Sequence, residues 1–327
     1  MDESRENVSV VGIDMSKHKF DVALLRAGKL KHKALRNDRG GHAALVTWLQ
    51  AKGVSTAHVC MESTNIYGEA LGEYLHDRGF SVSIVNPARV KGFAQSELIR
   101  TKTDKADAAL IARFCAAMRP GLWQPDPPEI RALRALVRRL DALVEMRQQE
   151  INRQEVANEV LLETLAEHIA YLDQNIQTIK KQIQDHIDNH PDLKEKRALL
   201  ESIPGIGEAT IQVILAEFAD ITRFKRAKCL ASFLGVAPRE IQSGCSVRGR
   251  TRMSKVGRSQ LRKAFFMPAL VAMRYNPPVI AMKERMLKAG KPKMAIVGAA
   301  MRKLVHLIYG VLKSGKPFDP EYTVNRA

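Results

Sequence analysis

The chain has 327 residues, of which 45% are hydrophobic, so it is long enough for two or three domains with buried cores. Its formal net charge of +17 and pI near 9.8 point to a polyanionic partner, most directly a nucleic acid, with an anionic membrane surface as the weaker alternative. No segment approaches roughly 18 uninterrupted apolar residues, and the first nine residues are polar and charged, so we expect neither a transmembrane helix nor a signal peptide. The four cysteines are widely spaced and form no CxxC pair, which argues against structural zinc and for a reducing, cytoplasmic compartment.

The first 125 residues predict alternating strands and helices. Residues 8–25 form two β-branched runs around a polar turn, a hairpin signal, and residues 29–36 can add a third strand. Apolar residues then recur at helical spacing up to Gly53, and short strands follow at 56–61 and 80–85 around a helix at 66–78. Residues 103–118 are alanine-rich and predict a helix that begins at Thr103 as N-cap.

This order, three sequential strands followed by alternating helices and strands, matches the ribonuclease H-like arrangement. In that arrangement Asp14 ends the first strand and Glu62 the fourth, and these two strands lie side by side. A carboxylate at the end of a hydrophobic strand is costly to place unless a partner lies in front of it. A turn hydrogen bond is the alternative for Asp14 alone.

Asp104 and Asp107 are three apart at the start of one helix, so they share a face. Acids in a first turn also favour the helix dipole, which is the alternative explanation for Asp104. Four clustered carboxylates repel one another unless a cation neutralises them. We therefore expect Asp14, Glu62, Asp104 and Asp107 to bind Mg²⁺, with Mn²⁺ as the alternative, and to act on a phosphodiester.

A proline-rich segment at 120–128 predicts a domain boundary, and residues 129–189 contain neither Pro nor Gly. Apolar residues from Leu165 to Ile187 repeat at heptad spacing, which predicts a coiled-coil arm that assembles a homo-oligomer, a dimer or tetramer. An intramolecular helical hairpin, with a turn near Asn158, is the alternative. The expected domains are 1–125, 126–191 and 192–327.

The last domain is mostly helical by pattern and contains IPGIG at residues 203–207. This predicts a helix-hairpin-helix, in which Gly205 and Gly207 let backbone amides meet a phosphate without reading sequence. A plain glycine-rich turn between helices is the alternative.

Residues 223–263 are dense in lysine and arginine and hold one acid, Glu240. This density predicts a polyanion-binding face. A loop of small residues that contains Ser243 lies within it, and a serine followed by glycine can approach a phosphate closely. From the residues alone, a hydroxyl that only contacts phosphate is the alternative to a nucleophile. The expected DNA-binding side chains are Arg248, Arg250, Arg252, Lys255 and Arg258.

Short motifs along nearly the whole chain resemble the DEDD-type transposases of bacterial insertion sequences, the group that includes Piv-type DNA invertases. They are VVGID, CMEST and KTDKADA in the first half, and IPGIG, FLGVAP, SGCSVRG, MSKVG and LRKAFF in the second. The resemblance implies a RuvC-like catalytic domain, a coiled-coil arm, a C-terminal transposase domain and a bacterial, nucleoid-associated location.

The resemblance also implies a mechanism. The nucleophile would be Ser243, with Ser246 as competitor, forming a phosphoserine link to the cut strand beside carboxylate-bound Mg²⁺ in a composite site that can draw on two subunits. The expected partners are double-stranded donor and target DNA and a structured guide RNA. The basic residues at 29–36 and 283–293 agree with an RNA partner, although DNA alone would explain them.

The expected function is thus site-specific DNA recombination. A RuvC-like structure-specific nuclease that uses metal-activated water is the first alternative. A non-catalytic nucleic-acid-binding protein is the second.

Overall fold

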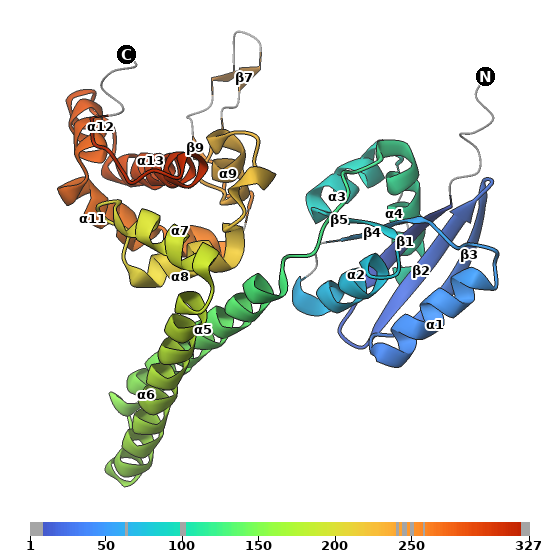
Figure 1. Cartoon of the computed structure of the whole chain (residues 1–327), viewed down its shortest axis with the longest axis horizontal. Coiled ribbons are helices and arrows are strands. Elements are labelled where there is room, and N and C mark those ends of the chain that lie inside the picture. The colour runs from blue at the N-terminus through green and yellow to red at the C-terminus, as the bar shows by residue number, and fades with distance from the viewer. Residues whose placement is uncertain are drawn as a thin grey trace. The chain divides into compact units, whose positions relative to one another are not determined.

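The computed structural model describes residues 9–62, 65–98, 103–239, 242–243, 247–248, 252–257 and 259–321. Contacts divide the chain into two compact units, Met1–Asp126 and Pro127–Ala327. The division falls in the proline-rich segment 120–128. Figure 1 colours the first unit from blue to green and the second from green to red.

The first unit is built on a five-stranded mixed sheet of order β3-β2-β1-β4-β5. β1 (Val10–Met15) pairs antiparallel with β2 (Lys19–Arg26), which pairs antiparallel with β3 (Lys29–Arg36). β4 (His58–Glu62) lies parallel to β1, and β5 (Ser81–Val85) lies parallel to β4. This mixed order agrees with the ribonuclease H-like arrangement predicted from the sequence.

Helices cover both faces of this sheet (Figure 1). Leucines of α1 (Arg39–Gln50) and α2 (Glu69–His76), the latter preceded by a 3₁₀ turn at Asn65–Gly68, share one core with β1 and β2. On the other face, apolar residues of α3 (Pro87–Ser96) and α4 (Asp104–Met118) pack against the sheet. Two buried layers thus hold the sheet rigid.

Helix α3 is the element of this unit that sequence reasoning missed. No helix was predicted between the strand at residues 80–85 and the helix that begins at Thr103. The Asn86 side chain accepts a hydrogen bond from the Ala88 amide at 2.8 Å, and Pro87 occupies the first helical turn. Asn at the N-cap followed by Pro is a helix-start signal, and it could have identified the helix.

The second unit begins with two long antiparallel helices, α5 (Pro128–Gln154) and α6 (Glu159–Asp188). Asn158 caps α6 by accepting from the Val160 amide at 3.2 Å, so the turn lies where the hairpin alternative predicted it. The heptad residues of α6 pack against α5 within one chain; the buried ones are Leu172, Ile176, Ile183 and Ile187. Within this chain the apolar stripe is therefore covered by α5, as the hairpin alternative predicted, and assembly of subunits through the arm stays a prediction.

Further helices complete the second unit around the same core. They are α7 (Pro191–Glu201), α8 (Glu208–Phe218), a 3₁₀ turn (Ile221–Arg223), α9 (Ala227–Phe233), α10 (Ser259–Ala264), α11 (Phe266–Tyr275), α12 (Pro277–Lys288) and α13 (Lys293–Ser314). Two short antiparallel ladders lie between α9 and α10: β6 (Pro238–Arg239) with β9 (Arg252–Met253), and β7 (Gln242–Ser243) with β8 (Val247–Arg248).

Within the described residues, α13 is the one helix long and apolar enough to cross a membrane. Its apolar residues from Ile296 to Val311 are largely buried in the core of the second unit. α13 is therefore accounted for as a core helix.

Candidate active site

The register of the sheet brings the first two predicted carboxylates to one edge. Ile13 of β1 pairs with Met61 of the parallel strand β4. The residues that follow, Asp14 and Glu62, therefore emerge side by side at the carboxyl ends of these strands.

Helix α4 brings Asp104 and Asp107 to the same edge, since it crosses the back of β1 and β2. The approach is close: a Cβ atom on Gly12 would lie 2.2 Å from the Ala112 backbone nitrogen and 2.3 Å from the Ala108 carbonyl oxygen. A glycine is required there because any side chain would push the helix off the sheet. Thr103 caps the helix by accepting from the Ala106 amide at 3.2 Å, which fixes its first turn.

The electrostatics of Asp14 show that these acids converge. The pKa of Asp14 is raised to about 6, first by burial and then by the charges of Asp107, Asp104, Glu62 and Asp21. Each neighbouring carboxylate makes the charged form of Asp14 less favourable. We call these five residues the carboxylate cluster.

Asp21 and Lys19 are members of this site that sequence reasoning did not identify. Asp21 is paired with Asp14 across the β1–β2 ladder. The Lys19 ammonium lies 2.7 Å from an Asp104 carboxylate oxygen and 3.2 Å from one of Asp21. These contacts hold the pKa of Lys19 above its usual value, and the Lys19 hydrogen bond is the main cause of the lowered pKa of Asp104. Lys19 and Asp21 alternate along β2 and so share one face of the strand, but this pattern alone does not place them beside Asp14 and Asp104.

The donor set of the carboxylate cluster suits a hard divalent cation, because it consists of oxygen ligands alone. Among the described residues, however, no three Asp, Glu, His or Cys side chains are close enough together to ligate one ion. The Asp104 contact with Lys19 gives a physical reason, since it turns one acid toward an internal cation. Metal binding by this cluster would require Asp104 to exchange Lys19 for the ion.

Ser243 lies in the second unit, at the end of β7. Its backbone pairs with Val247 of β8, which makes a narrow two-stranded ladder. Residues 244–246, which include the competing Ser246, fall outside the described part of the chain. The backbone geometry thus places Ser243 on this ladder, and its role as nucleophile stays a prediction.

The predicted DNA-binding cations are described only in part. Arg248 belongs to β8, while Arg250 and Arg258 fall outside the described residues. Arg252 on β9 and Lys255 are exposed. The carbonyl of Lys255 accepts a hydrogen bond from the Arg262 guanidinium at 3.2 Å, which ties this loop to α10.

The two glycines of IPGIG have different surroundings. Gly205 adopts a positive φ of 101°, and a Cβ there would lie 2.8–2.9 Å from Ala272 of α11, so tight packing accounts for this glycine. Gly207 is open, and precedes the first turn of α8. Glu208 follows it and pairs with Arg197 at 3.2 Å. The negative charge of Glu208 in this first turn would repel a phosphate. Phosphate binding here therefore stays a prediction, and close packing is the alternative explanation for Gly205.

Comparison with known proteins identifies the family. The chain is 36% identical over 313 residues to the pilin gene-inverting protein of Moraxella bovis, which covers 94% of this chain and 97% of that protein. It belongs to the IS110 family of DEDD transposases. The family model for the DEDD transposase domain matches residues 11–163, and the model described as "Transposase IS116/IS110/IS902 family" matches residues 197–284.

More distant IS110-family relatives also span most of the chain. The transposase for insertion sequence element IS1328 of Yersinia enterocolitica is 24% identical over 305 residues, with 82% of this chain and 84% of that protein covered. IS110-family transposases and DNA invertases cleave and rejoin DNA, so the chain is a DNA-recombining enzyme. The non-catalytic alternative is therefore set aside.

Proposed function

We propose that this transposase cleaves and rejoins DNA by attack of the Ser243 hydroxyl on a phosphodiester, assisted by Mg²⁺ bound to Asp14, Glu62, Asp104 and Asp107. The observation that carries its metal-binding part is the placement of Asp14, Glu62, Asp104 and Asp107 at one edge of the sheet, where burial first and then the neighbouring charges raise the pKa of Asp14. The DEDD transposase family is typically metal-dependent, which agrees with this chemistry.

The carboxylates have a defined task in this proposal. Asp14 and Glu62 at the carboxyl ends of β1 and β4, with Asp104 and Asp107 at the start of α4, would hold the cation. Bound Mg²⁺ supplies charge stabilisation on the phosphodiester oxygens. Lys19 holds Asp104 and Asp21, and Asp104 would have to leave Lys19 in order to hold a cation.

The serine accounts for rejoining as well as cleavage. The Ser243 oxygen forms a new bond to phosphorus and gives up its proton, while the bond from phosphorus to one sugar oxygen breaks and that oxygen leaves as a strand-end hydroxyl. The phosphoserine ester keeps the phosphodiester energy in a covalent link. A hydroxyl from a second strand can then displace the serine and reseal the DNA. Attack by water would lose that link, and it is the chemistry of the nuclease alternative.

The remaining partners follow as proposals. The DNA phosphates next to the serine would be contacted by five cationic side chains, those of Arg248, Arg250, Arg252, Lys255 and Arg258. The peptide amides around Gly205 and Gly207 would contact further phosphates. A structured guide RNA and assembly into a dimer or tetramer rest on the family resemblance. Loss of recombination after ribonuclease treatment tests the RNA partner.

The acids are tested by strand cleavage. Asp104→Asn combined with Asp107→Asn should lower Mg²⁺-dependent cleavage of element-end DNA at least about a hundredfold, because the cation loses two ligands. Asp77→Asn is the matched control, since Asp77 is an exposed acid of the same unit beyond the end of α2. Cleavage that survives in the double variant, or that does not depend on a divalent cation, contradicts the proposal.

A further inference from the structure

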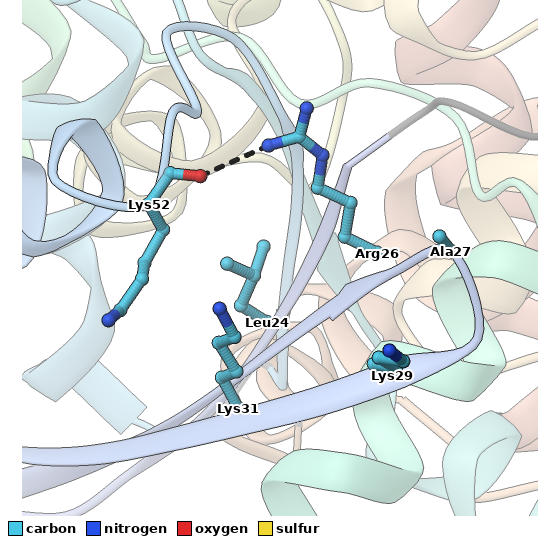
Figure 2. Close-up of a pocket in the computed structure, with 6 residues that line it drawn as sticks. All are labelled: Leu24, Arg26, Ala27, Lys29, Lys31 and Lys52. Atoms are coloured by element: carbon cyan, nitrogen blue, oxygen red, sulfur yellow. Dashed lines mark hydrogen bonds between the residues drawn. The ribbon is translucent and has the colours of Figure 1, made fainter.

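A basic hollow of about 180 Å³ lies at the turn between β2 and β3, beside the end of α1. It is lined by Leu24, Arg26, Ala27, Lys29, Lys31 and Lys52 (Figure 2). Four of these side chains are cationic and the other two are apolar. Its chemistry therefore differs completely from that of the carboxylate cluster.

The hollow lies at the opposite end of the sheet from the carboxylates. Asp14 of β1 pairs with Asp21, whereas Val10, at the other end of β1, pairs with Leu25. Arg26 follows Leu25 and faces Lys29 across the hairpin. An anion bound here cannot be the phosphate at Asp14, because the length of a strand separates them: five residue steps of about 3.4 Å each.

The backbone around the hollow is preformed. Ala27 and Gly28 both have positive φ, 46° and 73°, as a tight two-residue hairpin turn requires. The Arg26 guanidinium donates to the carbonyl oxygens of Lys52 at 3.0 Å and Gly53 at 3.3 Å, which ties the hairpin to the end of α1. The four cations are thus held near one another before any ligand binds.

These cations lack acidic partners within the described part of the chain. At the other end of the same strands, by contrast, Lys19 pairs with Asp104, and Arg36 pairs with Asp38 at 3.2 Å. Lys29, Lys31 and Lys52 are exposed and form no ion pair with a described carboxylate. Like charges gathered in this way repel one another, and an anion relieves that repulsion.

The arrangement is linear, which favours a chain of phosphates over a single small anion. Lys29, Lys31 and Lys33 alternate along β3 and so share one face of the sheet, about 7 Å apart along the strand. Lysines on an edge strand also prevent pairing with another sheet. That role does not account for Arg26 and Lys52, which come from other elements and face the same hollow.

We propose that the hollow and the lysine row of β3 bind the phosphodiester backbone of a nucleic-acid segment other than the one held at the carboxylate cluster. The inference rests on the proposed function only in taking nucleic acid as the partner. Contacts to phosphate give affinity and register without reading sequence. This surface therefore holds and orients a flanking segment.

The test measures binding by the full chain in the absence of divalent cations. Lys29→Ala, Lys31→Ala and Lys52→Ala are combined, and fluorescence anisotropy follows a labelled duplex DNA of arbitrary sequence and, separately, a labelled RNA hairpin, over a range of salt concentrations. The control combines Lys91→Ala, Lys180→Ala and Lys181→Ala, which removes the same charge from exposed helix positions. A single Lys31→Glu variant repeats the test with less change to the fold.

On duplex DNA we expect the slope of log affinity against log salt to become shallower by about 2 to 3, since each lost phosphate contact removes about 0.9. A loss larger than the control's on either probe supports the inference and identifies the backbone as DNA or RNA. Affinity and slope equal to the control's on both probes overturn it. If binding equals the control's but the variant still cleaves DNA in the presence of Mg²⁺, the inference about the hollow fails while the proposed function stands. Failure of the inference can therefore be told apart from failure of the proposed function.

Discussion

Two single residues, Asp14 and Lys19, have opposite effects on the carboxylate cluster. Asp14 adds a charge that burial and four neighbouring acids disfavour, while Lys19 supplies the one cation that the described structure places against Asp104. Asp14 should therefore make stability depend on pH, and Lys19 should limit the affinity for a metal ion.

The pH prediction concerns Asp14→Asn in metal-free buffer. The folded-state pKa of Asp14, about 6, lies above its ordinary value of 3.8, so folded protein holds this proton more tightly than unfolded protein. The contribution of Asp14 to the free energy of unfolding should therefore fall as pH rises from about 4 to above 6. Asp14→Asn removes this cost, so its melting temperature should exceed that of wild type at pH 8, and the difference should vanish near pH 4. A difference that does not depend on pH would contradict the assignment.

The metal prediction concerns Lys19→Met. This substitution keeps the apolar stem and removes the ammonium that pairs with Asp104 and Asp21. We expect Mn²⁺ to bind several-fold more tightly, as measured by titration calorimetry, because the ion no longer competes with an internal cation. Lys91→Met is the control. Weaker Mn²⁺ binding in Lys19→Met would mean that Lys19 supports the metal site instead of competing with it.

At the scale of elements, the closeness of α4 to β1 sets where two of the acids lie. Gly12→Ala should destabilise the first unit by about 1–3 kcal/mol in denaturant unfolding, since its Cβ would collide with the α4 backbone. Gly92→Ala on α3 is the control. A Cβ there meets nothing within 4 Å, so alanine should stabilise the helix by about 0.5–1 kcal/mol. Equal effects of the two substitutions would contradict the packing argument.

The buried seam between α5 and α6 should contribute strongly to the stability of the arm. Ile183 is fully buried between α5 and α6, so Ile183→Ala should cost about 2–5 kcal/mol of unfolding free energy. Val160, 83% exposed near the turn, should tolerate alanine with little change. The cost of Ile183→Ala should be the same at low and high protein concentration, because the seam lies within one chain. A cost that changes with protein concentration would indicate an intermolecular coiled coil.

The same elements show what local patterns can and cannot predict. Short apolar and β-branched runs were enough to predict all five strands of the first unit, and Thr103 marked the start of α4. The heptad pattern of α6 predicted a buried seam correctly, but a seam has the same pattern whether its partner helix is on the same chain or another. Lys19 and Asp21 were missed because they lie near Asp14 and Asp104 only after β2 has paired and α4 has packed.

The short motifs along the whole chain were sufficient to identify the family, and the comparisons with known proteins confirm that family. The proposed catalytic residues are divided between the two units: the acids belong to the first and Ser243 to the second. No local pattern can predict whether they act on one phosphate, since that depends on DNA and on the assembly of subunits. The serine is therefore the part of the account that most needs a direct measurement.

That measurement is the trapping of a covalent protein–DNA adduct. Labelled element-end DNA is incubated with Mg²⁺ and wild-type, Ser243→Ala, Ser246→Ala or Asp14→Asn protein, and denaturing electrophoresis separates protein-linked from free cut strands. The account predicts an adduct with wild type and Ser246→Ala and none with Ser243→Ala or Asp14→Asn. An adduct that persists in Ser243→Ala, or cut strands that carry no protein in wild type, would contradict it.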